Sequence, residues 1–176
     1  YFGSCRYQIK KDEEYQRILE IFKKYNIRYF FYNGGNDSMD TCNKISKFLS
    51  SVNYECKVIG IPKTIDNDLM YTDHTPGFGS ALKYVVTSSL ELIDDINSYE
   101  KGRVTIIEVM GRNAGWLTAS TVYAQNKTGM PHLIYVPEKP FDKEEFLNNV
   151  KEIFAKEKKC VVAVSEGIKD SNNKLI

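Results

Sequence analysis

Short apolar segments alternate with segments of helical periodicity along the whole chain, and this alternation constrains the fold more than any other feature. Runs rich in β-branched and aromatic residues predict buried strands at 27–32, 56–61, 103–110, 132–136 and 160–164. Apolar side chains at helical spacing predict helices at 12–24, 39–49, 82–96, 116–123 and 141–158. This order predicts the α/β class, with a Rossmann-like parallel sheet, right-handed crossovers and helices on both faces.

The composition is that of an ordinary globular protein, and its 176 residues suffice for one domain with its own core. The formal net charge of +1 gives no general attraction to nucleic acid or to an anionic membrane. No apolar run approaches the roughly 20 residues that a membrane helix needs, and the first residues show no signal-peptide pattern. Because the chain stops abruptly at Ile176, we expect it to be a segment of something longer.

The four cysteines are scattered, at positions 5, 42, 56 and 160. They form no CxxC pair and have no histidine nearby, which argues against a zinc site. Free thiols in a reducing cytoplasm are therefore predicted.

The stretch GIPKTIDND, from Gly60 to Asp68, combines charges and turn residues directly after a predicted strand. Its three neighbouring polar side chains, Asp66, Asn67 and Asp68, would repel one another in a packed core. We therefore expect them to lie in a loop that faces water, a cation or a substrate. A loop at the carboxyl end of a strand is where ligands bind in α/β sheets.

Lys63, Thr64, Asp66 and Asp68 supply a cation, a hydroxyl and two carboxylates within this loop. A carboxylate can take a proton from an attacking alcohol, and a lysine can neutralise phosphoryl oxygens during transfer. An Asx-turn, in which an aspartate binds its own backbone, explains one of the aspartates but not the whole set. The set therefore favours a catalytic role.

A second polar loop, GGNDS at 34–38, joins a predicted strand to a predicted helix. Small residues and bare backbone amides at a helix start can hold a phosphate at the positive end of the helix dipole. Alternatively, Asp37 or Ser38 caps the helix, as such residues do in many proteins. The loop is neither a Walker A motif nor a dinucleotide-binding GxGxxG motif.

Two arginines flank one predicted strand. Arg112 follows it between Gly111 and Gly115, and its planar guanidinium suits a phosphate or a carboxylate, although arginine is also common on surfaces. Arg103 stands at the start of the same strand, more than roughly 20 Å away at the usual rise per residue, so the two arginines cannot bind one ligand within one chain. If both bind substrate, Arg103 must reach the site of a neighbouring subunit.

The polar loops all follow strands, and the carboxyl ends of parallel strands share one edge of a sheet. We therefore expect Glu166, Arg112, the pair Asp66 and Asp68, and the loop at 34–38 to be neighbours, although they are far apart in sequence.

These motifs resemble the phosphofructokinase family over nearly the whole chain. The matching segments are GGNDS at 34–38, PKTIDND at 62–68, TDHTPGFGSA at 72–81, EVMGRNAGWL at 108–117 and SEG at 165–167. The resemblance is to the central α/β portion of the family's fold, with the flanking parts absent. It implies phosphoryl transfer to the 1-hydroxyl of fructose 6-phosphate, which is a step of glycolysis. It also implies Mg²⁺ as the cofactor and a location in the cytoplasm.

The resemblance also implies residue roles. Asp66 is similar to the family's general base, Asp68 to its companion carboxylate, and Lys63 joins them as a catalytic residue. Contacts to the sugar phosphate are implied for Thr64, Arg103, Met110, Gly111, Arg112 and Glu166. Arg103 matches an arginine that the family donates across a subunit interface, which implies a homo-oligomer from a family with allosteric members.

Two positions indicate the phosphoryl donor. ATP-using members of the family carry motifs that resemble GGDGS and PGTIDND, with glycine at the two positions that correspond to 37 and 63. This chain has Asp37 and Lys63 there, a pair that resembles the pyrophosphate-using branch. A carboxylate at 37 would repel the α-phosphate of a nucleotide, and a lysine at 63 would offset the charge of pyrophosphate. The resemblance assigns donor binding to Gly35, Asn36, Asp37 and Ser38, and implies a reversible reaction.

Position 36 departs from the family, because many members carry a magnesium-binding aspartate there and this chain has Asn36. An amide binds Mg²⁺ more weakly than a carboxylate does, so we expect weak ligation by Asn36 and Asp68, helped by donor oxygens and waters. Two alternatives remain for the function of the chain. One is an ATP-dependent 6-phosphofructokinase, and the other is a non-catalytic module that binds sugar phosphates or has a regulatory role. The intact Asp66 and Asp68 argue against the non-catalytic module.

Overall fold

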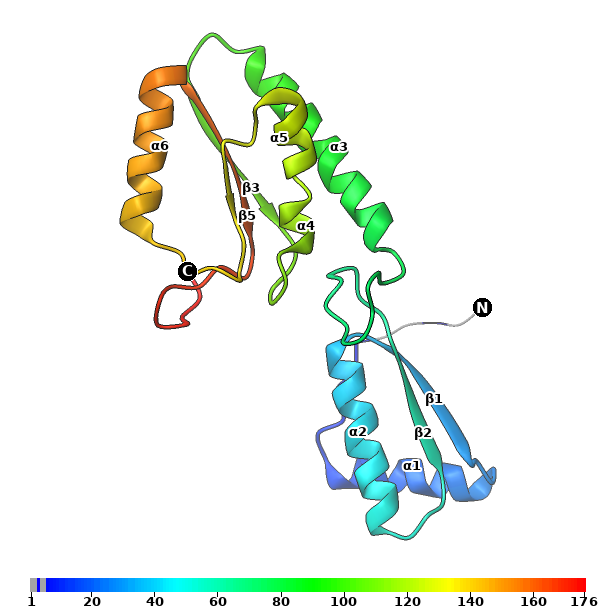
Figure 1. The fold of residues 1–176 in the computed structure, drawn as a ribbon. Coiled ribbons are helices and arrows are strands. Elements are labelled where there is room, and N and C mark those ends of the chain that lie inside the picture. The colour runs from blue at the N-terminus through cyan, green and yellow to red at the C-terminus, as the bar shows by residue number, and fades with distance from the viewer. Residues whose placement is uncertain (1–2, 4–5) are drawn as a thin grey trace. The chain divides into compact units, whose positions relative to one another are not determined.

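Strands and helices alternate along the computed structural model, which describes residues 3 and 6–176 (Figure 1). The chain divides into two compact units, Tyr1–Lys63 and Thr64–Ile176. All paired strands in both units run parallel. The α/β class predicted from the alternation is therefore confirmed, but the strands form two sheets instead of one.

The first unit contains α1 (Asp12–Lys24), β1 (Tyr29–Gly34), α2 (Asn36–Ser51) and β2 (Lys57–Pro62). β1 pairs with β2 from Tyr29 opposite Lys57 to Gly34 opposite Pro62. Because both strands end together, the residues that follow them lie side by side. The Lys63 amide accordingly donates a hydrogen bond to the Gly34 carbonyl over 2.9 Å.

One face of this small sheet forms the core of the first unit. Leu19 and Phe22 of α1 and Ile45 and Leu49 of α2 are buried against the inward side chains of both strands. The opposite face carries the exposed side chains Tyr29, Phe31, Ile59 and Ile61. The period-two burial pattern along β1 and β2 shows that the described helices cover this sheet on one face.

The second unit contains α3 (Phe78–Asn97), β3 (Arg103–Val109), α4 (Trp116–Ala119), α5 (Val122–Thr128), β4 (Leu133–Tyr135), α6 (Lys143–Glu157) and β5 (Lys159–Ser165). Its strands lie in the order β3-β5-β4. Figure 1 shows α6 on one side of this sheet and α3, α4 and α5 on the other, so the prediction of helices on both faces is confirmed for this unit. The central strand β5 is buried from Cys160 to Ala163.

The helix predicted at 116–123 is two short helices, α4 and α5, so that prediction was wrong in detail. Ser120 donates a hydrogen bond to the Leu117 carbonyl, and Thr121 donates one to the Thr118 carbonyl. Both hydroxyl groups are buried, and their bonds compete with the helical pattern at the junction.

A substitution at Leu49 tests the assignment of the core of the first unit, because this side chain is only 1% exposed. We expect Leu49→Ala to lower the free energy of unfolding of this unit by about 2–5 kcal/mol, since the truncation leaves a cavity. Hydrogen exchange of the β1 and β2 amides in the full-length protein measures the loss. The control Ile21→Ala, on the exposed side of α1, should cost about 0.5 kcal/mol. Equal losses for the two variants would contradict this core assignment.

Candidate active site

The loop after β2 directs its polar residues in two directions. The Asp66 amide donates a hydrogen bond to Thr64 Oγ1 over 3.0 Å, which folds the loop back on itself. Asp66 and Asp68 are partly exposed, whereas Asn67 between them is buried and has a left-handed backbone with φ of 60°. The expectation that all three side chains face outward was therefore wrong for Asn67, because an amide that is hydrogen-bonded can be buried without penalty.

The carboxylate of Asp66 lies in an environment that favours its protonated form. Burial raises its pKa most, and the negative charges of Asp68 and Glu166 raise it further. Arg112 opposes this by lowering the pKa of Asp66. Residues from three separate loops therefore act on one carboxylate within the second unit. The expectation that Asp66, Arg112 and Glu166 are neighbours agrees with these interactions, although Asp66 follows β2 and not a strand of this sheet.

The loops that follow β3 and β5 are bound to each other. The Glu166 amide donates to the Val109 carbonyl over 2.9 Å, and Glu166 Oε1 accepts from the Gly111 amide over 3.2 Å. Ser165 Oγ donates to the Gly111 carbonyl over 2.5 Å. These bonds hold Glu166 beside the loop that carries Arg112.

Two glycines permit this close approach. A Cβ atom added at Gly167 would overlap the carbonyl oxygen of Arg112, so any larger residue would push the two loops apart. Gly111 has φ of +131°, a backbone conformation that favours glycine. Gly111 was predicted as a substrate contact. No role was predicted for Ser165 or Gly167, although both belong to the quoted motif SEG.

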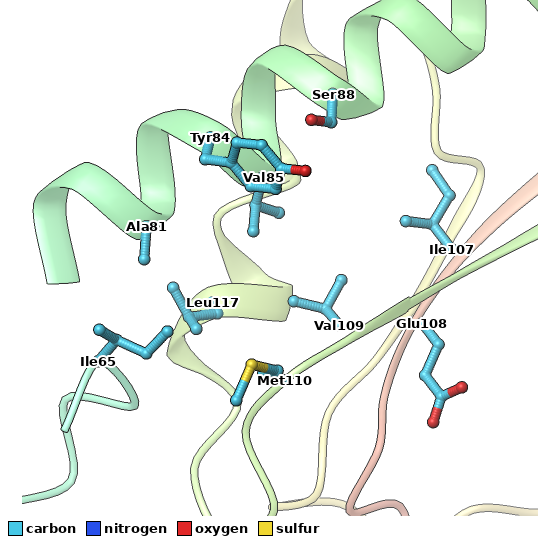
Figure 2. A pocket seen from close by; sticks show the side chains of 10 residues that line it. All are labelled: Ile65, Ala81, Tyr84, Val85, Ser88, Ile107, Glu108, Val109, Met110 and Leu117. Carbon is cyan, nitrogen blue, oxygen red and sulfur yellow. The ribbon is translucent and has the colours of Figure 1, made fainter. Parts of the chain in front are cut away.

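A cavity of about 280 Å³ lies between α3 and β3 in the second unit (Figure 2). It is lined by Ile65, Ala81, Tyr84, Val85, Ser88, Ile107, Glu108, Val109, Met110 and Leu117. Met110 lines this apolar space, is 58% exposed, and precedes Arg112 by two residues along the chain. A mostly apolar wall does not suit a phosphate, so we assign the polar chemistry to the loops beyond the strand ends and not to this cavity.

The predicted donor residues lie in the first unit. Gly35 is the N-cap of α2 and makes no side-chain cap, while Asn36, Asp37 and Ser38 form the first turn. The alternative that Asp37 or Ser38 caps the helix is therefore wrong. A Cβ atom added at Gly34 would overlap the Ser38 hydroxyl, so this position requires glycine. That this loop and the residues around Asp66 in the second unit form one site stays a prediction.

Arg103 and the loop at 110–112 stand at opposite ends of β3, as the sequence predicted. The Arg103 guanidinium lies over the ring of Tyr99, 3.4 Å from its centroid. Arg103 is exposed and remote from Arg112 along the strand. Its assignment to a neighbouring subunit stays a prediction.

The described residues contain no group of three or more His, Cys, Asp or Glu side chains that could hold a metal ion. Asp68 Oδ1 is nevertheless buried and has no hydrogen-bond partner among the described residues. An unpartnered carboxylate oxygen is a suitable ligand for Mg²⁺, so Asp68 fits its predicted role. Asn36 is exposed at the start of α2 in the first unit.

Cys42, Cys56 and Cys160 carry free thiols, as predicted, and Cys5 lies outside the described residues. In the described part of the chain, every helix is too short or too polar to span a bilayer.

A parallel α/β fold with carboxylates, an arginine and small residues in the loops after its strands is typical of enzymes that bind phosphorylated ligands. A family model described as "Phosphofructokinase" matches residues 1–176. The chain therefore belongs to the phosphofructokinase family.

The chain is similar to pyrophosphate–fructose 6-phosphate 1-phosphotransferases from two bacteria. It is 47% identical to the Halomonas elongata protein over 173 aligned positions, and the match covers 94% of this chain and 41% of that protein. It is 44% identical to the Xanthomonas campestris protein over 182 aligned positions, gaps included, and the match covers 99% of this chain and 44% of that protein. The chain thus spans less than half the length of these relatives.

The fold of the chain is also similar to a solved structure of a pyrophosphate-dependent phosphofructokinase. The pyrophosphate-dependent phosphofructokinase from Marinobacter aquaeolei is 47% identical and superimposes with a TM-score of 0.76, over 96% of this chain and 43% of that chain. Relatives named as ATP-dependent 6-phosphofructokinases are also similar, at 36–38% identity.

The opposing charges around Asp66 predict opposite effects of two substitutions. Glu166→Gln removes a negative charge and should lower the pKa of Asp66, whereas Arg112→Gln removes a positive charge and should raise it. A carbon-13 NMR titration of the Asp66 carboxyl in the full-length protein measures both shifts. Shifts of the same sign, or none, would contradict the charge cluster.

The raised pKa also sets a direction for stability. The folded protein holds the Asp66 proton more tightly than the unfolded chain does. This group therefore favours the folded state at low pH, and the gain is lost as the pH rises through the raised pKa of the folded protein.

Proposed function

We propose that this chain is the part of a pyrophosphate-dependent phosphofructokinase that carries its general base, and that the enzyme transfers a phosphoryl group from pyrophosphate to the 1-hydroxyl of fructose 6-phosphate. The observation that carries the proposal is the Asp66 carboxylate, partly buried and influenced by Asp68, Glu166 and Arg112 at once. Family membership and the names of the most similar relatives support the same reaction.

Asp66 acts as the general base in this proposal. A base works best when its pKa lies near the working pH, and the environment of Asp66 raises its pKa from the ordinary aspartate range in that direction. It takes the proton of the 1-hydroxyl while the hydroxyl oxygen forms a bond to one phosphorus of pyrophosphate. The P–O–P bond breaks at the same phosphorus and phosphate leaves; in the reverse reaction the proton returns to the oxygen. The bond from the Asp66 amide to Thr64 steadies its backbone during the transfer.

The sugar phosphate is held by the two interlocked loops. Arg112 offers a guanidinium to an anionic oxygen, and Glu166 accepts hydrogen bonds from sugar hydroxyls. Met110 and Gly111 shape the loop between them. Thr64 is a further substrate contact, and Arg103 reaches the site of a neighbouring subunit in a homo-oligomer.

The donor is bound by the first unit. Gly35, Asn36, Asp37 and Ser38 form the amino-terminal turn of α2 without a side-chain cap. The Ser38 amide donates to the Gly35 carbonyl, so the amides of Asn36 and Asp37 are the ones left for an anion. Lys63, exposed and hydrogen-bonded through its backbone to Gly34, supplies positive charge to pyrophosphate during catalysis. Asp37 disfavours the α-phosphate of ATP, and the relatives named as ATP-dependent have lower identity to this chain.

Mg²⁺ fits this chemistry, with Asp68 and Asn36 as weak ligands. The ion, when bound, offsets negative charge on the phosphoryl oxygens. Asp68 meanwhile raises the pKa of Asp66, which favours proton acceptance by the base.

The proposed reaction is a step of glycolysis in the cytoplasm, where free thiols such as those of Cys42, Cys56 and Cys160 persist. A non-catalytic module that binds sugar phosphates would have no use for a carboxylate with a raised pKa. This consideration favours the enzyme over the regulatory alternative.

Removal of the base tests the proposed reaction. We expect Asp66→Asn in the full-length protein to lower kcat by about 10²–10⁴-fold, because an amide cannot accept the hydroxyl proton. KM for fructose 6-phosphate should change little, since the sugar contacts come from other residues. The control Asp73→Asn changes an exposed carboxylate in the next turn and should leave both constants unchanged. Undiminished turnover by Asp66→Asn would refute the assignment.

The donor assignment predicts a change of preference. We expect Asp37→Gly combined with Lys63→Gly to shift the ratio of kcat/KM for ATP to that for pyrophosphate at least about tenfold toward ATP, or about 1.4 kcal/mol. The two single variants serve as controls and should each give a smaller shift. An unchanged ratio in the double variant would count against the roles of both residues.

A further inference from the structure

Asn67 is the one residue of the loop at 66–68 that turns inward. It is 8% exposed and has a left-handed backbone with φ of 60°, a conformation that asparagine tolerates better than most residues. Its Oδ1 accepts a hydrogen bond from the Thr75 amide over 2.8 Å, and its Nδ2 donates to the Asp73 carbonyl over 3.3 Å. One side chain therefore joins the carboxylate loop to the turn at 73–75.

That turn is attached to the core of the second unit. Thr75 is fully buried, and its carbonyl accepts a hydrogen bond from the Phe78 amide over 3.1 Å at the start of α3. Phe78 packs in one buried cluster with Val109 and Leu117. Val109 is the last residue of β3, directly before the loop that carries Arg112.

A continuous series of contacts thus runs from Asn67 to the substrate loop. The Thr75 amide donates to Asn67, the Phe78 amide donates to Thr75, and Phe78 shares a buried cluster with Val109 and Leu117. Asp66 is held on its other side, where its amide binds Thr64 Oγ1. The position of the Asp66 carboxylate relative to Arg112 is consequently set by hydrogen bonds on both sides of it.

We propose that Asn67 is a positioning residue that holds Asp66 for proton transfer by tying its loop to the buried turn at the start of α3. This inference rests on the proposed function of Asp66. Asn67 touches neither sugar nor phosphate in this assignment, so its effect passes through the base. A misplacement of about 1 Å at a reacting group can cost about 100-fold in rate.

The variant Asn67→Gly tests the side chain without straining the backbone. Glycine accepts the left-handed conformation but has no side chain to make either hydrogen bond. In the full-length protein, with fructose 6-phosphate, pyrophosphate and Mg²⁺, we expect kcat to fall by about 10- to 100-fold. KM for fructose 6-phosphate should stay within about threefold, because Arg112 and Glu166 remain held by their own loops. The Thr75 amide should exchange faster with solvent, since it loses its acceptor.

The matched control is Asn173→Gly. Asn173 belongs to the same unit and has φ of 63°, but its side chain is exposed. This variant should leave kcat, KM and exchange of the Thr75 amide unchanged. If Asn67→Gly keeps kcat within twofold of this control, or if KM rises as kcat falls, the positioning role is overturned.

A second measurement needs no variant. The Thr75 amide of the unaltered protein should be among the slowest to exchange in the segment 64–77, because it is buried and bound to Asn67. Fast exchange there would overturn the inference even if Asn67→Gly failed to fold. If the unaltered protein transferred no phosphoryl group, the proposed function would fall, and the exchange of the Thr75 amide would still decide whether Asn67 ties the two turns together.

Discussion

The parallel pairing of β3 with β5 is the constraint on which the candidate site depends. Its register sets Val109 opposite Ser165, so both strands end at the same edge and their loops begin side by side. The Glu166 amide then binds the Val109 carbonyl, and the Ser165 hydroxyl binds the Gly111 carbonyl. A shift of the register by one residue would move each side chain to the opposite face and would separate these partners.

The loops held by this pairing produce a balance of charge around one carboxylate. Burial, Asp68 and Glu166 favour the protonated form of Asp66, and Arg112 favours the ionised form. A base with a raised pKa accepts a proton more readily, but it loses its charge at a higher pH than an ordinary aspartate does. Arg112 limits that loss, so the same arginine that suits a phosphate also favours the ionised form of Asp66, which the proposed role as a base requires.

The sequence was the most successful guide to structure where burial follows a local period. The helix predicted at 12–24 has the observed bounds of α1, and each predicted strand lies within two residues of an observed one. It was less successful where a side chain competes with the backbone. Ser120 and Thr121 divide the helix predicted at 116–123, and Asn67 turns inward from a loop that was expected to face outward. Such local hydrogen bonds depend on partners that periodicity does not identify.

The sequence by itself determined the α/β class, the order of the elements and the chemistry of the loops, because hydrophobic period and residue type are local properties. It also placed Asp66, Arg112 and Glu166 after strands, from which their neighbourhood was predicted. Only the tertiary structure decided that the strands form two sheets, that Gly167 must lack a side chain, and that Asn67 is bound to Thr75. These features arise from atoms that are distant along the chain and meet only through packing, so no local pattern encodes them.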